Sequence, residues 1–250
     1  MTRLLSIFCA GAALGAGATA IAQQAPTARA AAPVDLTGYW VSVVSEDWAW
    51  RMRTPLKGDY ESVPLNADGV SAADSWSEVE DGSCLAFGAA ALLRMPTRLR
   101  IAWEDEQTLQ LETDNGEQTR LLRFGTDASP SGRRTLQGRS VAEWQITTEV
   151  VASGATAGVL TTRLDEPSWA SLEVVTADMS AAWLRPNGVP NSENAVMTEY
   201  FDRFSDAEDE WFTVTTILDD PTYLTEPFIV SSNFKREADG SNWRPTPCRP

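Results

Sequence analysis

The chain has 250 residues, three cysteines, a formal net charge of −15 and no histidine. Without histidine it cannot form a Ser-His-Asp triad, a Cys-His nucleophile pair, a histidine-ligated zinc site or a histidine general base. The excess of acidic residues disfavours nucleic acid and anionic membranes as partners, because their phosphate groups would be repelled. Three cysteines are too few for a four-thiolate metal site, and no glycine-rich phosphate-binding pattern follows a predicted strand, so we expect no cofactor and no metal.

Residues 1–22 have the pattern of a secretory signal peptide. Arg3 is followed by an uncharged run from Ile7 to Ala22, which ends in the small-x-small triplet Ala20-Ile21-Ala22. The run is shorter than the about 20 apolar residues that a membrane-spanning helix needs. We therefore expect cleavage before Gln23, a periplasmic or secreted mature protein, and no membrane insertion after cleavage.

The segment 23–33 is rich in alanine and proline and has no larger aliphatic side chain, so it predicts a disordered linker. We expect the remaining residues, 34–250, to form a single β-rich domain. Cys84 and Cys248 are the two cysteines that remain after cleavage. An even number in an oxidising compartment predicts one disulfide, and two free thiols are the alternative.

The first elements of the domain combine short strands and helices. A strand is predicted over 39–44, after the turn residue Gly38. Residues 48–53 alternate between an aromatic face and a basic face, which also predicts a strand. A short helix is predicted over 66–76 with Asn66 as its N-cap, and a second helical segment over 84–93, ending before Pro96.

After Pro96 the pattern becomes that of strands. Asp114-Asn115-Gly116 provides the positive-φ residues of a hairpin turn between segments 108–113 and 119–124. Sequential short strands with tight turns predict an antiparallel up-and-down meander, which closes into a lipocalin-like barrel to remove its edges. The interior of such a barrel can hold one small ligand. Beyond the strand near 99–103, further strands are predicted over 140–147, 158–164, 171–176, 195–204, 211–218 and 228–235.

Two segments contain candidate ligand-binding residues. Indole faces and guanidinium forks suit a small ligand that carries a carboxylate or an aromatic ring, through stacking and bidentate hydrogen bonds. The turn-rich loop 184–191 can present polar side chains at a barrel mouth. The alternative interpretations are a core-packing tryptophan face and a plain connection. The candidate residues are Trp48, Trp50, Arg51, Arg53, Arg185 and Asn187, with Asn191 a further possibility in the loop.

The segment 195–204 contains the candidate catalytic residues. Strand alternation places Glu199 on one face, and Tyr200 and Asp202 on the other. If the first face lines the interior, burial among apolar groups would raise the pKa of Glu199 and make it a candidate acid or base. If the second face does, Tyr200 and Asp202 are the candidates. The competing interpretation is a buried Glu–Arg pair or an exposed polar rung.

Several segments together resemble a family of uncharacterised exported bacterial proteins. The resemblance covers most of residues 34–248 and implies export, but it brings no established reaction. The chain is also loosely similar to the lipocalins, or calycins, in which the Gly and Trp of the first strand close the barrel floor; Gly38 and Trp40 match that spacing, and the sequence assigns no arginine partner. The segments that resemble the exported family are Asp35–Trp40, Leu172–Met179, Thr198–Arg203 and Asp219–Phe228.

The sequence therefore predicts an exported protein that binds a partly apolar or aromatic small molecule in a β-barrel. One alternative is a cofactor-independent lyase, isomerase or hydratase that uses carboxylate acid/base chemistry. Another is an envelope interaction module, which would expose an apolar patch instead of enclosing a cavity. The sequence leaves the ligand and the oligomeric state open.

Overall fold

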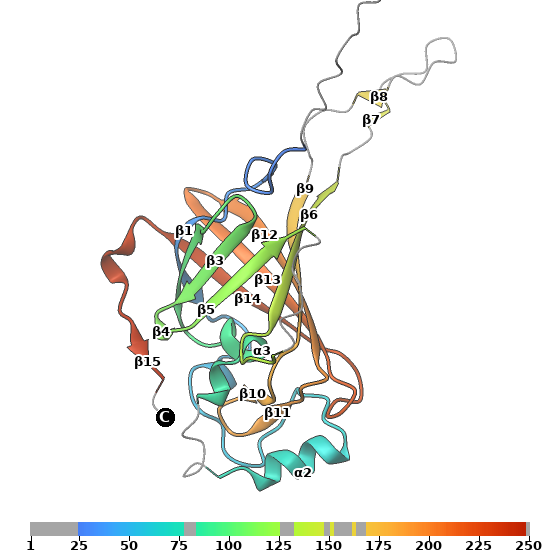
Figure 1. Ribbon diagram of the computed structural model, residues 1–250. Coiled ribbons are helices and arrows are strands. Elements are labelled where there is room, and N and C mark those ends of the chain that lie inside the picture. Colours follow the sequence, from blue (N-terminus) through green and yellow to red (C-terminus); the bar gives the residue numbers. More distant parts are fainter. Residues whose placement is uncertain are drawn as a thin grey trace, which may run out of the picture.

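Nine strands form a closed β-barrel (Figure 1). The computed structural model describes residues 25–77, 84–125, 133–147, 151–152, 162–163 and 169–248. The predicted signal peptide and most of the predicted strand 158–164 lie outside these residues. In chain order the barrel strands are β1 (Gly38–Val43), β2 (Arg98–Trp103), β3 (Thr108–Thr113), β5 (Thr119–Phe124), β6 (Arg139–Thr147), β9 (Trp169–Ala177), β12 (Val196–Asp206), β13 (Asp209–Asp219) and β14 (Phe228–Glu237).

The strands follow one another around the barrel in chain order, and β1 closes the ring by pairing with both β2 and β14. Eight neighbouring pairs are antiparallel, and β5 and β6 are parallel. Strand directions cannot alternate all the way round a ring with an odd number of strands, so one parallel pair is unavoidable. The predicted antiparallel meander closing into a barrel is confirmed, with this single parallel seam.

Aromatic side chains fill the barrel interior. The ring of Phe212 lies with its centroid 4.7 Å from that of Trp40 and 4.9 Å from that of Phe234. Phe201 lies 6.0 Å from Phe212 on the neighbouring strand, and all four side chains are buried. Aliphatic residues from the surrounding strands complete this cluster. This part of the interior is therefore a packed core.

Short elements cover one end of the barrel, which we call the helical end (Figure 1). The helix predicted over 66–76 forms over Ala67–Ser75, and the side chain of its N-cap, Asn66, accepts a hydrogen bond of 2.9 Å from the Gly69 amide. The predicted helix 84–93 is divided at Gly88, whose extended backbone interrupts the helical conformation. The elements of this end are α1 (Trp48–Arg51), α2 (Ala67–Ser75), the 3-10 turn η1 (Leu85–Phe87), α3 (Ala89–Leu92) and the hairpin β10 (Ala182–Arg185) with β11 (Val189–Asn191).

The strand predicted over 48–53 is wrong, because residues 48–51 form helix α1. Asp47 has a left-handed backbone, with φ 51°, and its carbonyl accepts the Arg51 amide at 3.0 Å. The buried Arg51 side chain then anchors the turn to the loop that follows α3, through a 2.8 Å bond from Nε to the Arg94 carbonyl. A segment of six residues is too short for its pattern to distinguish the periodicity of a strand from that of a helix, and here a tertiary contact stabilises the helix.

The sequence predicts a disordered linker over 23–33, and the described part of this segment, residues 25–33, lies against the end of the barrel opposite the helical end (Figure 1). The Thr27 hydroxyl donates to Glu106 at 2.7 Å, and the Trp144 indole donates to the Ala28 carbonyl at 3.1 Å. The Arg29 amide donates to the Glu106 carbonyl at 3.2 Å. Polar contacts hold this segment, so its lack of apolar side chains gave no signal of order.

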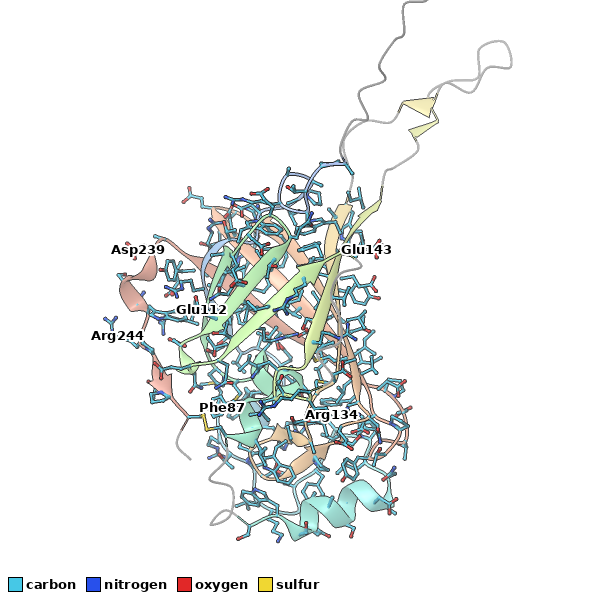
Figure 2. The ribbon with its side chains drawn as sticks, viewed as in Figure 1. Phe87, Glu112, Arg134, Glu143, Asp239 and Arg244 are labelled. Atoms are coloured by element: carbon cyan, nitrogen blue, oxygen red, sulfur yellow. A yellow bond between two sulfur atoms is a disulfide. The ribbon has the colours of Figure 1, made fainter. Side chains whose placement is uncertain are left out.

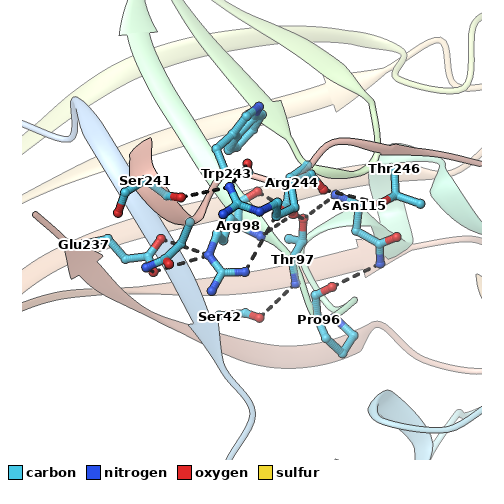
Figure 3. Close-up of polar contacts among 12 residues, drawn as sticks. Ser42, Pro96, Thr97, Arg98, Asn115, Glu237, Ser241, Trp243, Arg244 and Thr246 are labelled. Carbon is cyan, nitrogen blue, oxygen red and sulfur yellow. Dashed lines mark hydrogen bonds and ion pairs between the residues drawn. The ribbon is translucent and has the colours of Figure 1, made fainter. Parts of the chain in front are cut away.

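A disulfide joins Cys84 to Cys248, as the sequence predicts, and is visible as a yellow bond in Figure 2. The C-terminal tail that leads to it crosses the outside of β1 and β2 through the 3-10 turn η2 (Gly240–Asn242), and the short strand β15 (Thr246–Pro247) pairs with β4 (Asn115–Gly116). Figure 3 shows the polar contacts beneath the tail, including the 3.0 Å ion pair between Arg98 and Glu237. Two further short strands, β7 (Val151–Ala152) and β8 (Thr162–Arg163), pair with each other.

Candidate ligand-binding site

Three buried arginines line one cavity at the helical end. Arg51 is the last residue of α1, Arg94 follows α3, and Arg185 is the last residue of β10; their exposed fractions are 9%, 7% and 4%. The cavity has a volume of about 30 Å³. We call it the arginine cavity, and it is lined by Trp50, Arg51, Ala86, Ala91, Arg94, Met95, Leu184, Arg185 and Pro186.

Carboxylates partly neutralise two of the guanidinium groups. An NH1 atom of Arg51 lies 2.6 Å from Glu46, and an NH2 atom of Arg94 lies 2.7 Å from Asp47. Arg94 also lies over the ring of Phe228, 5.9 Å from its centroid. The second terminal nitrogen of each group, NH2 of Arg51 and NH1 of Arg94, is buried without a hydrogen-bond partner.

Arg185 lacks a carboxylate partner among the described residues. Its NH2 atom donates to the Ser62 hydroxyl at 3.0 Å, and its guanidinium lies over the indole of Trp50, 5.4 Å from the ring centroid. NH1 of Arg185 is buried and unpartnered. A buried donor without a partner costs about 1–3 kcal/mol, and more when it is charged. Three such donors around one cavity therefore lower the stability of the ligand-free protein.

The electrostatics of the arginine cavity favour an anion. Burial lowers the pKa of Arg51 and of Arg185, and the positive charge of Arg94 lowers the pKa of both groups further. Arginine stays protonated in proteins even so. The three charges therefore persist and repel one another, and a bound anion would relieve both this repulsion and the unsatisfied donors.

The residues that fix the arginines include two with strained backbones. Asp47, which binds Arg94, has φ 51°, and Ser62, which binds Arg185, has φ 64°. Non-glycine residues in the left-handed region are uncommon and gather at functional sites. Both strained residues thus hold a cavity arginine in place.

The structure brings together three of the six predicted ligand-binding residues. Trp50, Arg51 and Arg185 line the arginine cavity. Asn187 supports its wall, because its side-chain amide donates to the Leu56 and Asp59 carbonyls at 3.0 Å, while Asp59 accepts from the Trp50 indole. Trp48 and Arg53 are exposed and do not line the cavity. Asn191 is buried in β11 and is not a lining residue either.

Sequence reasoning missed Arg94. It follows the run Ala89–Leu93, which reads as a small apolar packing segment. Its two side-chain contacts, Asp47 and Phe228, are both distant in the chain. One feature of the sequence could have revealed it. Arg94 is a single arginine at the end of an apolar run, and an arginine that is buried there needs a partner.

The candidate catalytic residues do not converge. Glu199 is buried inside the barrel in a bidentate ion pair with Arg120, with NH1–Oε1 at 3.0 Å and NH2–Oε2 at 2.5 Å. This is the Glu–Arg pair of the competing interpretation, with Arg120 as the partner. Tyr200 and Asp202 alternate with Glu199 in β12 and so point to the outside of the barrel. Among the described residues no group of three or more acidic or cysteine side chains is placed to hold a metal.

A second cleft is partly lined by residues of the C-terminal tail, whose polar contacts Figure 3 shows. It has a volume of about 400 Å³ and is lined by residues of β1, of segment 96–98, of the turn at 114–115 and of the tail. Its polar groups already have partners: Thr97 and Asn115 bond to neighbouring main chain, and Arg98 pairs with Glu237. The arginine cavity is therefore the better candidate site.

No protein-family model, curated protein or solved structure matches the chain. No helix among the residues that the structure describes is long and apolar enough to cross a membrane. The function must therefore be inferred from the arginine cavity itself.

Proposed function

We propose that this protein is an exported binding protein for a small molecule with an anionic group, which the arginine cavity holds. The observation that carries the proposal is the convergence of Arg51, Arg94 and Arg185, each buried and each with an unpartnered terminal nitrogen. Buried polar groups in proteins nearly always have partners, so three orphan donors on residues that line one cavity call for an acceptor.

A carboxylate is the anion that the geometry favours first. Guanidinium groups bind planar carboxylates through two parallel hydrogen bonds, and such charged bonds are about twice as strong as neutral ones. The indole of Trp50 adds a flat apolar wall beside Arg185. Phosphate and sulfate offer the same anionic oxygens, and the experiment below separates the three.

The binding site in this proposal lies at the helical end of the barrel, outside the aromatic core. We expected the ligand within the barrel, but Trp40, Phe201, Phe212 and Phe234 occupy that part of the interior. The enzyme alternative lacks a comparable observation, since Glu199 is already paired with Arg120.

Export and the lipocalin-like relationship are parts of the same proposal. The signal-peptide pattern and the disulfide between Cys84 and Cys248 support an oxidising compartment outside the cytoplasm. The lipocalin-like relationship gains support from Arg236 on the last strand, whose guanidinium lies 5.3 Å from the ring centroid of Trp40. The sequence alone assigned no arginine to that position.

Titration of the mature protein with benzoate, phosphate and sulfate tests the proposal. Binding is measured by calorimetry and by the fluorescence of Trp50, with Trp50→Phe identifying its share of the signal. Arg185→Met should weaken binding by about tenfold or more, since a charged hydrogen bond is lost. Arg100→Met, which removes an exposed guanidinium from β2, is the control for general charge effects.

The result expected is saturable binding of benzoate that Arg185→Met weakens by about tenfold or more and Arg100→Met preserves. A preference for phosphate or sulfate would change the ligand class and keep the site. The proposal fails if none of the three anions binds, or if the two arginine variants lose affinity equally.

A further inference from the structure

An open groove lies near the arginine cavity, and the two share no lining residue. It has a volume of about 550 Å³. Two of its residues contact the cavity arginines directly: the Ser62 hydroxyl accepts from Arg185, and the Phe228 ring lies under Arg94. We call it the apolar groove, and it is lined by Ser62, Val63, Pro64, Glu226, Pro227, Phe228 and Ile229.

The two volumes suit a ligand with a small head and a larger body. A cavity of about 30 Å³ has room for roughly two water molecules, at about 10–15 Å³ each. It can therefore accept a carboxylate group but no larger part of a molecule. The apolar groove, at about 550 Å³, falls within the range of about 300–1,000 Å³ that is usual for small-molecule sites.

The lining of the apolar groove selects the chemistry of the body. Val63, Pro64, Pro227, Phe228 and Ile229 are apolar, and Ile229 leaves 62% of its surface exposed. Burying such a side chain under a ligand removes apolar surface from water, which is favourable. Glu226 is the one charged residue among the seven that line the groove, and its carboxylate would repel a second anionic group.

We propose that the ligand is an amphiphilic monoanion, whose carboxylate enters the arginine cavity and whose apolar chain or ring lies in the apolar groove. This inference rests on the proposed function, because the head group uses the same three arginines. It excludes dicarboxylates and sugar phosphates, which would place a charged or strongly polar group against Glu226 and Ile229.

A chain-length series tests the inference. The mature protein is titrated by calorimetry with butanoate, octanoate and dodecanoate, each below its micellar concentration, and with octanol as the uncharged match for octanoate. A fully buried methylene strengthens binding by about fourfold, and one side of an open groove should give about twofold. Affinity should therefore rise along the carboxylate series, and octanol should bind far more weakly than octanoate.

Two matched variants locate the body of the ligand. Ile229→Asp places a charge in the apolar groove and should flatten the dependence on chain length. Ile146→Asp makes the same change at an isoleucine of β6 that is 50% exposed and does not line the groove. It should leave the series unchanged.

The outcomes separate this inference from the function on which it rests. Equal affinity for the three carboxylates, or equal effects of the two aspartate variants, would overturn the inference and leave the anion site standing. Equal binding of octanol and octanoate would overturn both the amphiphilic monoanion and the anionic head group. Absence of binding by every carboxylate, together with absence of binding by benzoate, phosphate and sulfate, would overturn both proposals.

Discussion

Arg120 on β5 and Glu199 on β12 form a bidentate ion pair inside the barrel, with their side chains 0% and 1% exposed. Arg120 also donates from NH2 to Thr176 at 3.2 Å, and Thr176 and Ser140 lie 2.8 Å apart. The pair lies within a hydrogen-bonded network of polar side chains, which offsets the cost of removing two charges from water.

Loss of one partner of this pair should destabilise the protein more than loss of both. Arg120→Met and Glu199→Leu each leave an uncompensated buried charge, which costs about 3–5 kcal/mol. The double variant restores an uncharged interior and should lose clearly less than either single variant. Urea unfolding of the four proteins gives the free energies. Additive losses would show that the two residues act independently.

Loss of Arg185, unlike loss of Arg120, should have little effect on the stability of the ligand-free protein. In the ligand-free protein its burial and the repulsion from Arg94 offset its contacts with Ser62 and Trp50. Arg185→Met should therefore change the free energy of unfolding by less than about 1 kcal/mol, although it weakens anion binding. Comparison with Arg120→Met in the same urea series distinguishes a binding arginine from a structural one. A loss as large as that of Arg120→Met would assign Arg185 to the fold.

Asp35 should make the stability depend on pH in the acid range. Burial alone would raise its pKa, but hydrogen bonds from the Thr37 side chain and amide, with the charges of Arg236 and Arg203, lower the pKa overall. A lowered folded-state pKa gives stability that is present above the unfolded value of about 3.9 and is lost as the pH falls through the folded value.

Asp35→Asn should accordingly be less stable than the parent protein at neutral pH, and the difference should shrink as the pH falls below about 4. Thr37→Val removes only the side-chain donor and should give an intermediate result. Unfolding by urea at a series of pH values measures the effect. A difference that stays constant across the series would rule out the titration of Asp35 as its cause.

The disulfide should contribute strongly to stability, because Cys84 and Cys248 are 164 residues apart in the chain. Closing so long a loop in the unfolded chain removes entropy equivalent to about 5 kcal/mol. Replacement of both cysteines by serine should lower the urea midpoint accordingly. Trp243→Ala, which loosens the tail from Tyr39 with the disulfide intact, should have a smaller effect. Equal midpoints with and without reductant would contradict this account.

Local signals in the sequence predicted much of the fold. The alternation of residues 195–204 placed β12 and put Glu199 on the face opposite Tyr200 and Asp202, but it left open which face lines the interior. The cap at Asn66 placed the start of α2. Such signals act between residues a few positions apart, so they survive in a single sequence. The closed meander followed from the number of strands and the shortness of their turns.

Long-range contacts could not be predicted in the same way. The partner of Glu199 is 79 residues away, and the barrel register alone decides that it is Arg120 and not Arg203 on the same strand. Arg94 reaches Asp47 across 47 residues, and only the folding of the helical end brings them together. Three of the nine residues that line the arginine cavity were predicted, because Trp50, Arg51 and Arg185 lie in segments whose composition is unusual.

The parallel seam between β5 and β6 gives the buried polar network a further role. The seam has three paired positions, whereas β12 and β13 share eleven. Arg120 extends from β5 across this junction to Ser140 on β6, Thr176 on β9 and Glu199 on β12. These side chains therefore connect β5 to three other strands at the seam, where the barrel has its fewest backbone pairs. The polar network supplements the backbone pairing at the one place where the odd number of strands forces two neighbours to run parallel.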